Sequence, residues 1–564
     1  MTDIFTGTFL ATAKGYGFVS TGTPPDIFIP EDFTNGALHL DTVECVLRRG
    51  SSSTRPDGEI VKLVSRGIPS IAGTFCAEKK GGYLTSLEPK IPYAFDIAPI
   101  AVKRLGLVDG HRVMFNVSLK GQVQITEIFG HKNDIGMDVL SMVRQSGVPY
   151  EFPQEVINEA NALPDTVTDA DTEGRVDYRH LHIITIDGAD TKDIDDAISL
   201  TKLPNSNFEL GVHIADVSHY VRPGSAIDLE ARKRGTSIYL ADRVIPMLPH
   251  KLSNGICSLN PHVDRLAMSC VMEINGQGDV VKHKLAPSVI HSKMRCTYDE
   301  VAQKTDEFAD MYKLAEILNK KRIARGALNL NVKEGKAIVD ESGFPLDIQL
   351  REANAATSLI EEFMIVCNET IAERSKNKPF VFRTHEEPEP DKMIQIQKDL
   401  ERLAAQPAVS TLILRNLKQA KYTMENIGHF GLASECYCHF TSPIRRYPDL
   451  LVHRSLKDGL KKRGLADLCL HCSWTERNAE TLERDVLQLK KVQFMADKVG
   501  QVFDGMVSSV VDWGIFVQLP NTVEGLVPAE FLTEEFRLGD AIKVALVKAD
   551  VEERKLTFAP RKTV

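Results

Sequence analysis

A short acidic segment constrains this chain more than any other feature. Residues 182–200 read HIITIDGADTKDIDDAISL, in which a β-branched run ends at an aspartate and more aspartates follow within ten residues. Such a run predicts a strand that leads into a loop. Carboxylates packed this closely repel one another, which raises their pKa and destabilises the fold. The candidates for a shared cation site are Asp187, Asp193, Asp195 and Asp196.

The oxygen donors of these aspartates favour particular metals. Oxygen ligands without His or Cys suit Mg²⁺, or Mn²⁺ in its place, better than zinc. The segment also fits a solvated acidic loop, the commonest fate of a charge cluster, or a helix cap at Asp193. It does not fit a calcium-binding loop, because Gly188 comes too early and no glutamate follows at the required place.

Length and composition predict a multidomain globular protein. The chain has 564 residues, 43% hydrophobic and 26% charged, too many for one core. No apolar run approaches the roughly 20 residues that a membrane span needs, and no signal-peptide pattern opens the sequence. Ten scattered cysteines fit a reducing cytoplasm. The net charge of −9 argues against indiscriminate coating of nucleic acid.

Aromatic residues alternate with small ones near the start of the chain, in KGYGF and then DIF. Tyr16 and Phe18 would share one face of a strand, and Phe28 would join them from the next strand. Exposed rings can stack on bases, at about 1–3 kcal/mol each, although rings on one face of a small barrel can also form its core. Gly15 and Gly17 favour the open face, because they thin the strand.

A second β-rich segment ends the chain. Apolar residues alternate over 542–546, and Trp513 and Phe516 lie near a glycine turn. An aromatic groove of this kind binds single-stranded nucleic acid in OB folds. Between the two β-rich ends, apolar residues at helical spacing predict an amphipathic helix over 476–498.

Several of these segments resemble known families. TIDGADTKDIDDA, VHIADVSHYVRPG, FRTHEEPEP and HFTSPIRRYPDLLVHR follow in the order found in the RNase II and RNase R family of 3′-to-5′ exoribonucleases, over about 175–500. KGYGF with DIF resembles a cold-shock domain. The last segment resembles the OB-fold RNA-binding module that is repeated in a large ribosomal small-subunit protein.

This resemblance implies an α+β catalytic domain of the RNB type, flanked by small all-β OB-fold barrels. The expected parts are a cold-shock-like OB domain over 1–68 and a second, divergent OB domain over 69–130. A connector and the RNB domain would occupy 131–498, with its core over about 180–498, and a C-terminal OB-fold RNA-binding domain would occupy 499–564.

The family's chemistry implies roles for the acidic and basic residues. It is processive hydrolysis of single-stranded RNA from a free 3′ end by two metal ions, Mg²⁺ or substituting Mn²⁺, which releases nucleoside 5′-monophosphates. Asp195 would be the residue whose loss stops hydrolysis. Arg445 would contact the scissile phosphate through its guanidinium fork, and Arg446 would support it. The expected metal ligands are Asp187, Asp193, Asp195 and Asp196.

The resemblance also implies residues that hold the RNA. Tyr239 would stack on the last base, and a second aromatic clamp common in the family aligns with Leu330. Glu362 would contact the ribose 2′-hydroxyl, with its neighbour Glu361 as the alternative, because the two point about 100° apart on a helix. Glu483 fits either a sugar contact or a solvated helix face.

Two rival functions remain: an RNA-binding regulator with an inactive catalytic domain, and an endonuclease or DNase. The first is disfavoured because an inactive member should have lost some of the four aspartates. The chain has no lysine-rich stretch after the last barrel and no additional N-terminal helical domain, both common in RNase R, so weak activity on structured RNA is expected. The chain is expected to be a cytoplasmic monomer that binds single-stranded RNA and no membrane.

Overall fold

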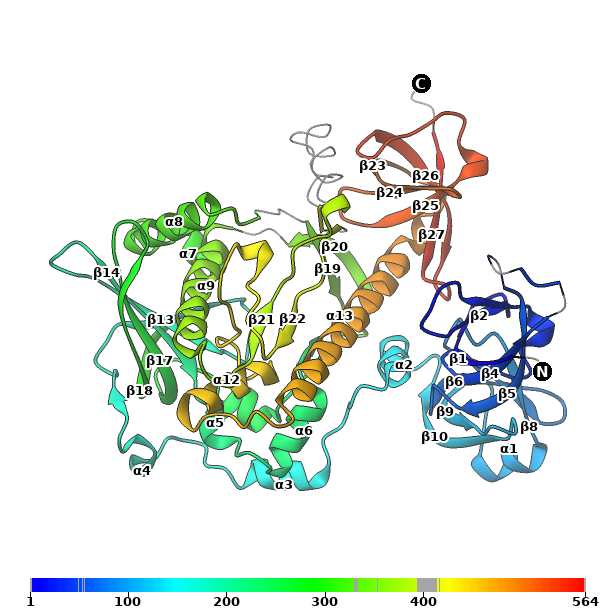
Figure 1. Ribbon diagram of the computed structural model, residues 1–564, viewed down its shortest axis with the longest axis horizontal. Helices are drawn as coiled ribbons and strands as arrows, with labels where there is room; N and C mark the ends of the chain where they lie inside the picture. The colour runs from blue at the N-terminus through cyan, green and yellow to red at the C-terminus, as the bar shows by residue number, and fades with distance from the viewer. Residues whose placement is uncertain are drawn as a thin grey trace. The chain divides into compact units, whose positions relative to one another are not determined.

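The computed structural model describes residues 3–48, 50–52, 54, 56–328, 333–351, 354–392, 413–414 and 416–561 (Figure 1). The clamp position assigned to Leu330 lies outside these residues. The chain divides into two compact units, Met1–Tyr150 with Val339–Phe344, and Glu151–Ile338 with Pro345–Val564. Across the described residues, no helix combines the length and the apolarity that crossing a membrane requires.

The first unit contains two five-stranded antiparallel sheets. The first sheet has the order β3-β2-β1-β4-β5 and the second β10-β9-β6-β7-β8. Alternate residues point into each core, which Phe9 and Val19 form in the first sheet and Phe75 and Phe115 in the second. The elements are β1 Ile4–Ala11, β2 Gly17–Ser20, β3 Ile27–Ile29, β4 Thr42–Leu47, β5 Gly58–Ser65, β6 Ile71–Ala77, β7 Gly82–Ser86, β8 Ala94–Ile97, α1 Pro99–Leu105, β9 His111–Val117, β10 Val123–His131 and α2 Met137–Ser146.

Gly17 has a different role from the one that the sequence suggested. A Cβ atom at this position would lie 2.5 Å from the ring of Phe9 and 2.6 Å from the carbonyl oxygen of Leu10. The glycine therefore makes room for a core ring on the buried side of β2. It does not open the aromatic face, since that face is on the other side of the strand.

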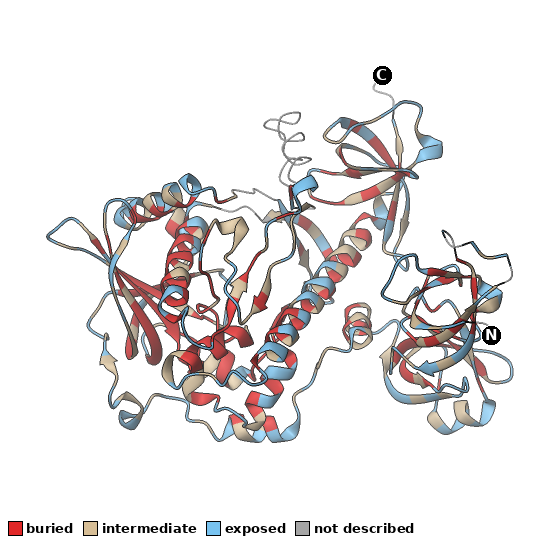
Figure 2. Cartoon of the chain, viewed as in Figure 1, coloured by how far each residue is buried: buried red, intermediate tan, exposed pale blue. Residues whose placement is uncertain are grey.

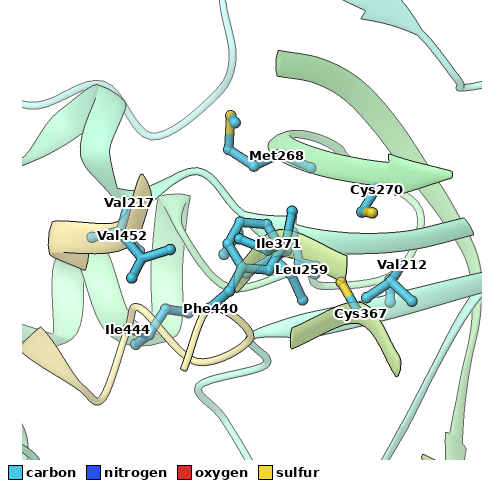
Figure 3. Packing of buried hydrophobic residues seen from close by; sticks show 14 of the residues in the cluster. Val212, Val217, Leu259, Met268, Cys270, Cys367, Ile371, Phe440, Ile444 and Val452 are labelled. Carbon is cyan, nitrogen blue, oxygen red and sulfur yellow. The ribbon is translucent and has the colours of Figure 1, made fainter. Parts of the chain in front are cut away.

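The second unit is built on a six-stranded sheet with the order β11-β18-β12-β13-β14-β17. Helices α8 and α9 pack on each other and on β13 and β14. Figure 3 shows this core, where Val212 and Cys270 of the sheet meet Cys367 and Ile371 of α9. Its strands are β11 Val176–Asp177, β12 Ile183–Asp187, β13 Asp196–Lys202, β14 Phe208–Ala215, β17 Asp264–Ile274 and β18 Val280–Thr297.

Further helices and short strands lie between Glu151 and the C-terminal barrel. They are α3 Gln154–Asn161, α4 Asp169–Thr172, α5 Val217–Tyr220, α6 Ala226–Arg234, β15 Ile238–Tyr239, β16 Val244–Ile245, α7 Tyr298–Gln303, α8 Ala309–Ala324, β19 Glu334–Val339, β20 Pro345–Arg351, α9 Ala355–Ser375, β21 Phe382–Thr384, β22 Lys421–Thr423, α12 Tyr447–Lys457 and α13 Leu465–Met495.

Helix α13 confirms the amphipathic helix that the sequence predicted, and it begins eleven residues earlier than expected. Its residues Leu482, Val486 and Leu489 are buried, and one side of the helix is buried along its length in Figure 2. After α13 the chain forms a closed barrel in the order β23-β24-β25-β27-β26. The barrel strands are β23 Val502–Val511, β24 Gly514–Gln518, β25 Glu524–Pro528, β26 Ala541–Asp550 and β27 Lys555–Pro560.

Candidate functional site

The predicted strand before the aspartates is β12, and the acidic segment is the loop that joins it to β13. The two strands are antiparallel with Ile184 opposite Ile198, so Asp187 at the end of β12 lies near Asp196 at the start of β13. We call residues 188–195 the carboxylate loop. Strand β12 is buried because β13 and β18 flank it on both sides.

Asp195 is the most deeply placed of the four aspartates, with 4% of its surface exposed. Its Oδ1 accepts a hydrogen bond of 2.8 Å from the backbone N–H of Ile444, and its Oδ2 lies 3.5 Å from Nε of Arg445. This burial excludes a freely solvated acidic loop. No helix follows Asp193, since β13 begins three residues later, so a helix cap is excluded as well.

The carboxylates of the site are buried close to one another, and both effects oppose their ionisation. Burial, and then the charge of Asp196, raise the pKa of Asp187 to about 8. Burial raises the pKa of Asp196 to about 6 against the opposing effect of Arg445 and Arg446, and burial raises the pKa of Asp195 well above its usual range. Oδ2 of Asp187 is buried and has no hydrogen-bond partner. These carboxylates thus lack sufficient positive charge from the protein alone.

This donor set fits a hard divalent cation. The unpartnered oxygen of Asp187 and the raised pKa values are what a bound cation would relieve. Within the described ranges, no three His, Cys, Asp or Glu side chains converge into a ready-made metal cage. Mg²⁺ does not need one, because it is commonly held by one or two carboxylates, with waters and substrate phosphates as its other ligands.

Arg445 and Arg446 are adjacent in sequence but have different surroundings. The Arg445 side chain is 42% exposed beside Asp195, and its Nη2 donates to Oγ of Ser442 over 2.9 Å. The guanidinium of Arg446 is largely buried and donates to Oδ1 of Asp449 over 2.7 Å. Arg445 is therefore the one available to a phosphate, whereas Arg446 holds the start of α12.

Tyr239 lies next to the carboxylate loop, at the end of β15. Its hydroxyl donates to Oδ2 of Asp193 over 2.6 Å, and its backbone N–H donates to Oε1 of Glu483 on α13 over 2.7 Å. Burial and the charge of Asp193 raise the pKa of this tyrosine. The side chain is still 41% exposed, which leaves part of the ring open for stacking. Glu483 is thus joined to the site through Tyr239.

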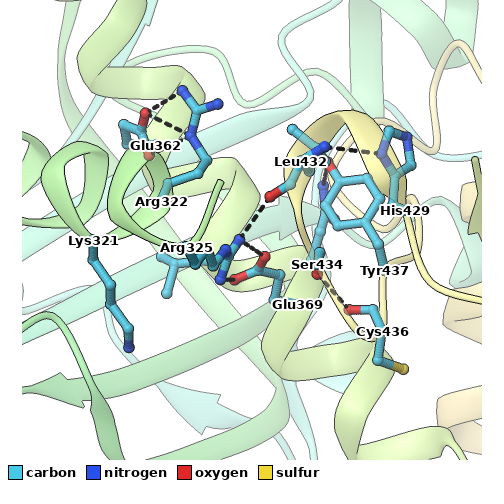
Figure 4. Close-up of polar contacts among 12 residues, drawn as sticks. Lys321, Arg322, Arg325, Glu362, Glu369, His429, Leu432, Ser434, Cys436 and Tyr437 are labelled. Carbon is cyan, nitrogen blue, oxygen red and sulfur yellow. Dashed lines mark hydrogen bonds and ion pairs between the residues drawn. The ribbon is translucent and has the colours of Figure 1, made fainter. Parts of the chain in front are cut away.

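Glu362 is committed to partners within the protein. Its carboxylate accepts a hydrogen bond of 2.7 Å from Nη2 of Arg322 (Figure 4). It accepts another of 2.7 Å from the side-chain amide of Asn319. Only 3% of Glu362 is exposed, whereas its neighbour Glu361 is exposed. Of the two residues that the sequence left open for the ribose contact, Glu361 is the more exposed, although burial still raises the pKa of its carboxyl group.

A cavity of about 470 Å³ lies beside Glu362, between α8, α9 and the turn from β17 to β18. Its lining includes Arg322, Arg325, Glu369 and Arg374, and none of the four aspartates. Arg325 is paired with Glu369 there, as Figure 4 shows. The cavity is therefore not lined by the carboxylate loop.

Two aromatic groups predicted to bind RNA are on β surfaces. Phe18 lies opposite Phe28 across β2 and β3, their ring centroids are 5.6 Å apart, and Tyr16 is also 5.6 Å from Phe28. Phe18 is 39% exposed, so these rings are not the core of the sheet. In the C-terminal barrel Trp513 is exposed and Phe516 is half-buried.

Sequence reasoning missed the backbone N–H of Ile444 as a partner of Asp195. The two residues are 249 positions apart, and an amide group carries no sequence signal. The carbonyl oxygen of Arg445 further accepts hydrogen bonds from Ser237 and Thr236, just before β15. The turn at 442–446 thus joins Tyr239, Arg445 and Asp195 in one site.

Comparison with known proteins gives matches along the whole chain. The RNB domain matches residues 175–462, the ribonuclease B OB domain 7–63, the cold shock domain 83–153 and the S1 RNA binding domain 496–560. Ribonuclease R of Thermotoga maritima is 40% identical over 99% of this chain and 89% of its own, and Ribonuclease R 1 of Lactococcus lactis is 37% identical over 98% and 79%. The apo form of Mycoplasma genitalium RNase R has the same fold, with a TM-score of 0.91 at 24% identity over 99% of this chain and 100% of its own.

Proposed function

The chain belongs to the RNB family of 3′-to-5′ exoribonucleases, and we propose that its four clustered aspartates bind Mg²⁺ and that the enzyme hydrolyses single-stranded RNA processively to nucleoside 5′-monophosphates. The protein acts as a cytoplasmic monomer on RNA with a free 3′ end. The observation that carries this proposal is the placing of Asp195, buried between the N–H of Ile444 and the guanidinium of Arg445.

The four aspartates Asp187, Asp193, Asp195 and Asp196 hold the metal in this proposal. Bound Mg²⁺, as two ions, supplies positive charge beside the phosphate and makes water easier to deprotonate. The side chain of Asp195 is fixed by Ile444, so its remaining lone pairs keep one direction. Its burial also strengthens every charge interaction that it makes, because little water screens them.

Arg445 contacts the scissile phosphate. Its guanidinium lies beside Asp195 and is partly exposed, so it can reach a phosphate oxygen without leaving the site. Two parallel N–H groups match two phosphate oxygens, and their charge stabilises the extra negative charge that develops during hydrolysis. Arg446 supports this position through its ion pair with Asp449.

Tyr239 and Glu361 hold the last nucleotide. The Tyr239 ring stacks on the 3′ base, while its N–H on Glu483 and its hydroxyl on Asp193 fix its orientation. Glu361 accepts a hydrogen bond from the ribose 2′-hydroxyl, which distinguishes RNA from DNA. This assignment replaces Glu362, because that carboxylate is already taken by Arg322.

Digestion of 5′-labelled RNA by wild type, Asp195→Asn and Asp190→Asn tests the proposal. Asp190 is exposed in the same loop, so its substitution removes the same charge without touching the buried site. Asp195→Asn is expected to lose about 10²–10³-fold or more in kcat and to keep its RNA affinity, because it removes charge and not binding surface. Asp190→Asn should cut like wild type.

The substrate panel is linear single-stranded RNA, circular RNA, a DNA oligonucleotide and a duplex with a 3′ overhang. Monophosphate release is expected from linear RNA and, weakly, from the duplex with a 3′ overhang, but not from circular RNA or from DNA. Cutting of the circle would make the protein an endonuclease. Binding without cutting by wild type would favour the regulator, and near wild-type cutting by Asp195→Asn would refute the site.

A further inference from the structure

Two residues outside the acidic segment hold the carboxylate loop from opposite ends. Arg295 is on β18, which pairs with β12 so that Arg295 is opposite Thr185. Its Nη2 faces three backbone carbonyl oxygens of the loop, at 3.4 Å from Gly188, 3.0 Å from Ala189 and 2.6 Å from Thr191. One guanidinium thereby fixes the first half of the loop.

Ser258 fixes the second half. Its hydroxyl donates to the carbonyl oxygen of Lys192 over 2.8 Å and accepts from the N–H of Ile194 over 3.1 Å. The serine is completely buried, and its own carbonyl oxygen accepts from Nε of Arg265 over 2.8 Å. The carbonyl oxygen of Ile194 also accepts a hydrogen bond of 3.0 Å from the backbone N–H of Leu259. The backbone on both sides of Asp193 is therefore bonded to a buried part of the fold.

These contacts replace the secondary structure that the loop lacks. Residues 188–194 lie outside β12 and β13, and their backbone polar groups must find other partners where they are buried. The six hydrogen bonds with Arg295, Ser258 and Leu259 oppose any change in the conformation of this loop. Asp193 and Asp195, the two of the four aspartates that belong to this loop, are thus kept in place by protein groups, although the carboxylates of the site repel one another.

We propose that Arg295 and Ser258 are positioning residues that hold the carboxylate loop in its catalytically competent conformation before a cation or RNA binds. Neither side chain ligates the metal or touches RNA in this proposal, which rests on the proposed function of the loop. Arg295 has an additional effect, since its charge partly offsets the burial that raises the pKa of Asp187. Positional errors of about 1 Å in such a site can cost about 10²-fold in rate.

Hydrogen exchange of the metal-free, RNA-free protein tests directly whether Arg295 and Ser258 hold the carboxylate loop. In Arg295→Met the amides of residues 188–194 should exchange about tenfold faster or more than in wild type, since opening of the loop no longer breaks the guanidinium contacts. Arg295→Lys, which keeps the charge and part of the reach, should be intermediate. Lys293→Met is the matched control, because Lys293 is an exposed cation two residues earlier on the same strand.

Steady-state kinetics on single-stranded RNA supply the second readout. Arg295→Met should lose about 10²-fold in kcat with little change in KM, because the loop is displaced while the RNA-binding surfaces remain. Ser258→Ala serves as an independent variant, and it should show the same exchange pattern in residues 192–194 even if Arg295→Met does not fold.

Wild-type exchange rates and wild-type kcat in both Arg295→Met and Ser258→Ala would overturn the proposal. Faster exchange over the whole sheet, equal to that of the loop, would also overturn it by assigning the residues to general stability. The exchange experiment uses neither metal nor RNA. Absence of RNA hydrolysis by wild type would therefore refute the proposed function, whereas the positioning role of Arg295 and Ser258 would still be judged by the exchange rates.

Discussion

Tyr239 combines two fixed polar contacts with a partly open ring. The contacts reach Asp193 on the carboxylate loop and Glu483 on α13, which come from distant parts of the chain. Since both polar groups of the tyrosine are fixed, the ring plane is fixed before a base arrives. The ring and the hydroxyl have separate tasks, and substitution can separate them.

Tyr239→Ala and Tyr239→Phe should therefore differ. The alanine variant loses the stack, worth about 1–3 kcal/mol, and should stop on longer final oligonucleotides, because short RNAs depend most on the clamp at their 3′ end. The phenylalanine variant keeps the stack and should stop at the wild-type length. Gel analysis of the limit products of 5′-labelled RNA decides this. Identical limit products for Tyr239→Ala and wild type would contradict the stacking role.

Glu361 and Glu362 offer a second pair of neighbours with separable roles. Glu361→Gln should reduce the preference for RNA over DNA and leave the melting temperature unchanged, because Glu361 is exposed. Glu362→Gln should destabilise the fold by about 3 kcal/mol, since it leaves the buried Arg322 without its counter-charge. Digestion of matched RNA and DNA oligonucleotides and thermal unfolding measure the two effects. A lost RNA preference in Glu362→Gln alone would reverse the assignment.

At the scale of the element, the end of the β12–β13 hairpin accumulates negative charge. In the folded protein the pKa of Asp187 is about 8 and that of Asp196 about 6, against 3.8 for an ordinary aspartate. The folded state therefore keeps protons that the unfolded chain releases. The free energy of unfolding of the metal-free protein should fall as pH rises from about 4 to about 8.

Asp187→Asn should remove much of this fall in the free energy of unfolding with rising pH, because an amide does not ionise. Without metal it should unfold at a higher temperature than wild type at pH 8 and at a similar temperature at pH 4, whereas Asp190→Asn should follow wild type. Adding Mg²⁺ should stabilise wild type, because the ion binds the folded state. Calorimetry with and without chelator makes the comparison. A wild-type melting temperature that rises with pH in chelator would contradict the explanation.

The elements of the site were more predictable than their contacts. The strand over Ile183–Ile186 and the helix that contains Val486 follow from side-chain periodicity, which is local information. The partners of the loop are not local: Ile444 acts through its backbone, and Arg295 is over a hundred positions from the carbonyl groups that it holds. The choice between Glu361 and Glu362 also depended on a distant residue, Arg322.

At the scale of the whole molecule, the C-terminal barrel is attached to the catalytic unit by contacts as well as by the chain. Nζ of Lys491 on α13 donates to the carbonyl oxygen of Thr522 over 2.7 Å, and the side-chain amide of Gln488 donates to the carbonyl oxygen of Arg554 over 3.2 Å. The barrel is thus joined to the same helix that carries Glu483.

Removing the exposed ring of this barrel should weaken RNA binding and spare the chemistry. Trp513→Ala should cost about 1–3 kcal/mol of affinity for long single-stranded RNA, with kcat at saturating RNA unchanged. Val510→Ala is the control, since Val510 is 52% exposed on the same barrel and offers no ring to stack. Fluorescence anisotropy with labelled RNA measures the affinity. Equal affinities for the two variants would remove Trp513 from the binding surface.

The turn at 442–446 leaves a protein engineer little freedom. It gives the amide of Ile444 to Asp195, the guanidinium of Arg445 to the same carboxylate and the carbonyl oxygen of Arg445 to the start of β15. An insertion there would displace the catalytic Asp195 and Arg445 together with the start of β15, which carries the base-stacking Tyr239. A reagent that captures RNA ends without trimming them is therefore better made by changing one aspartate than by rebuilding the turn.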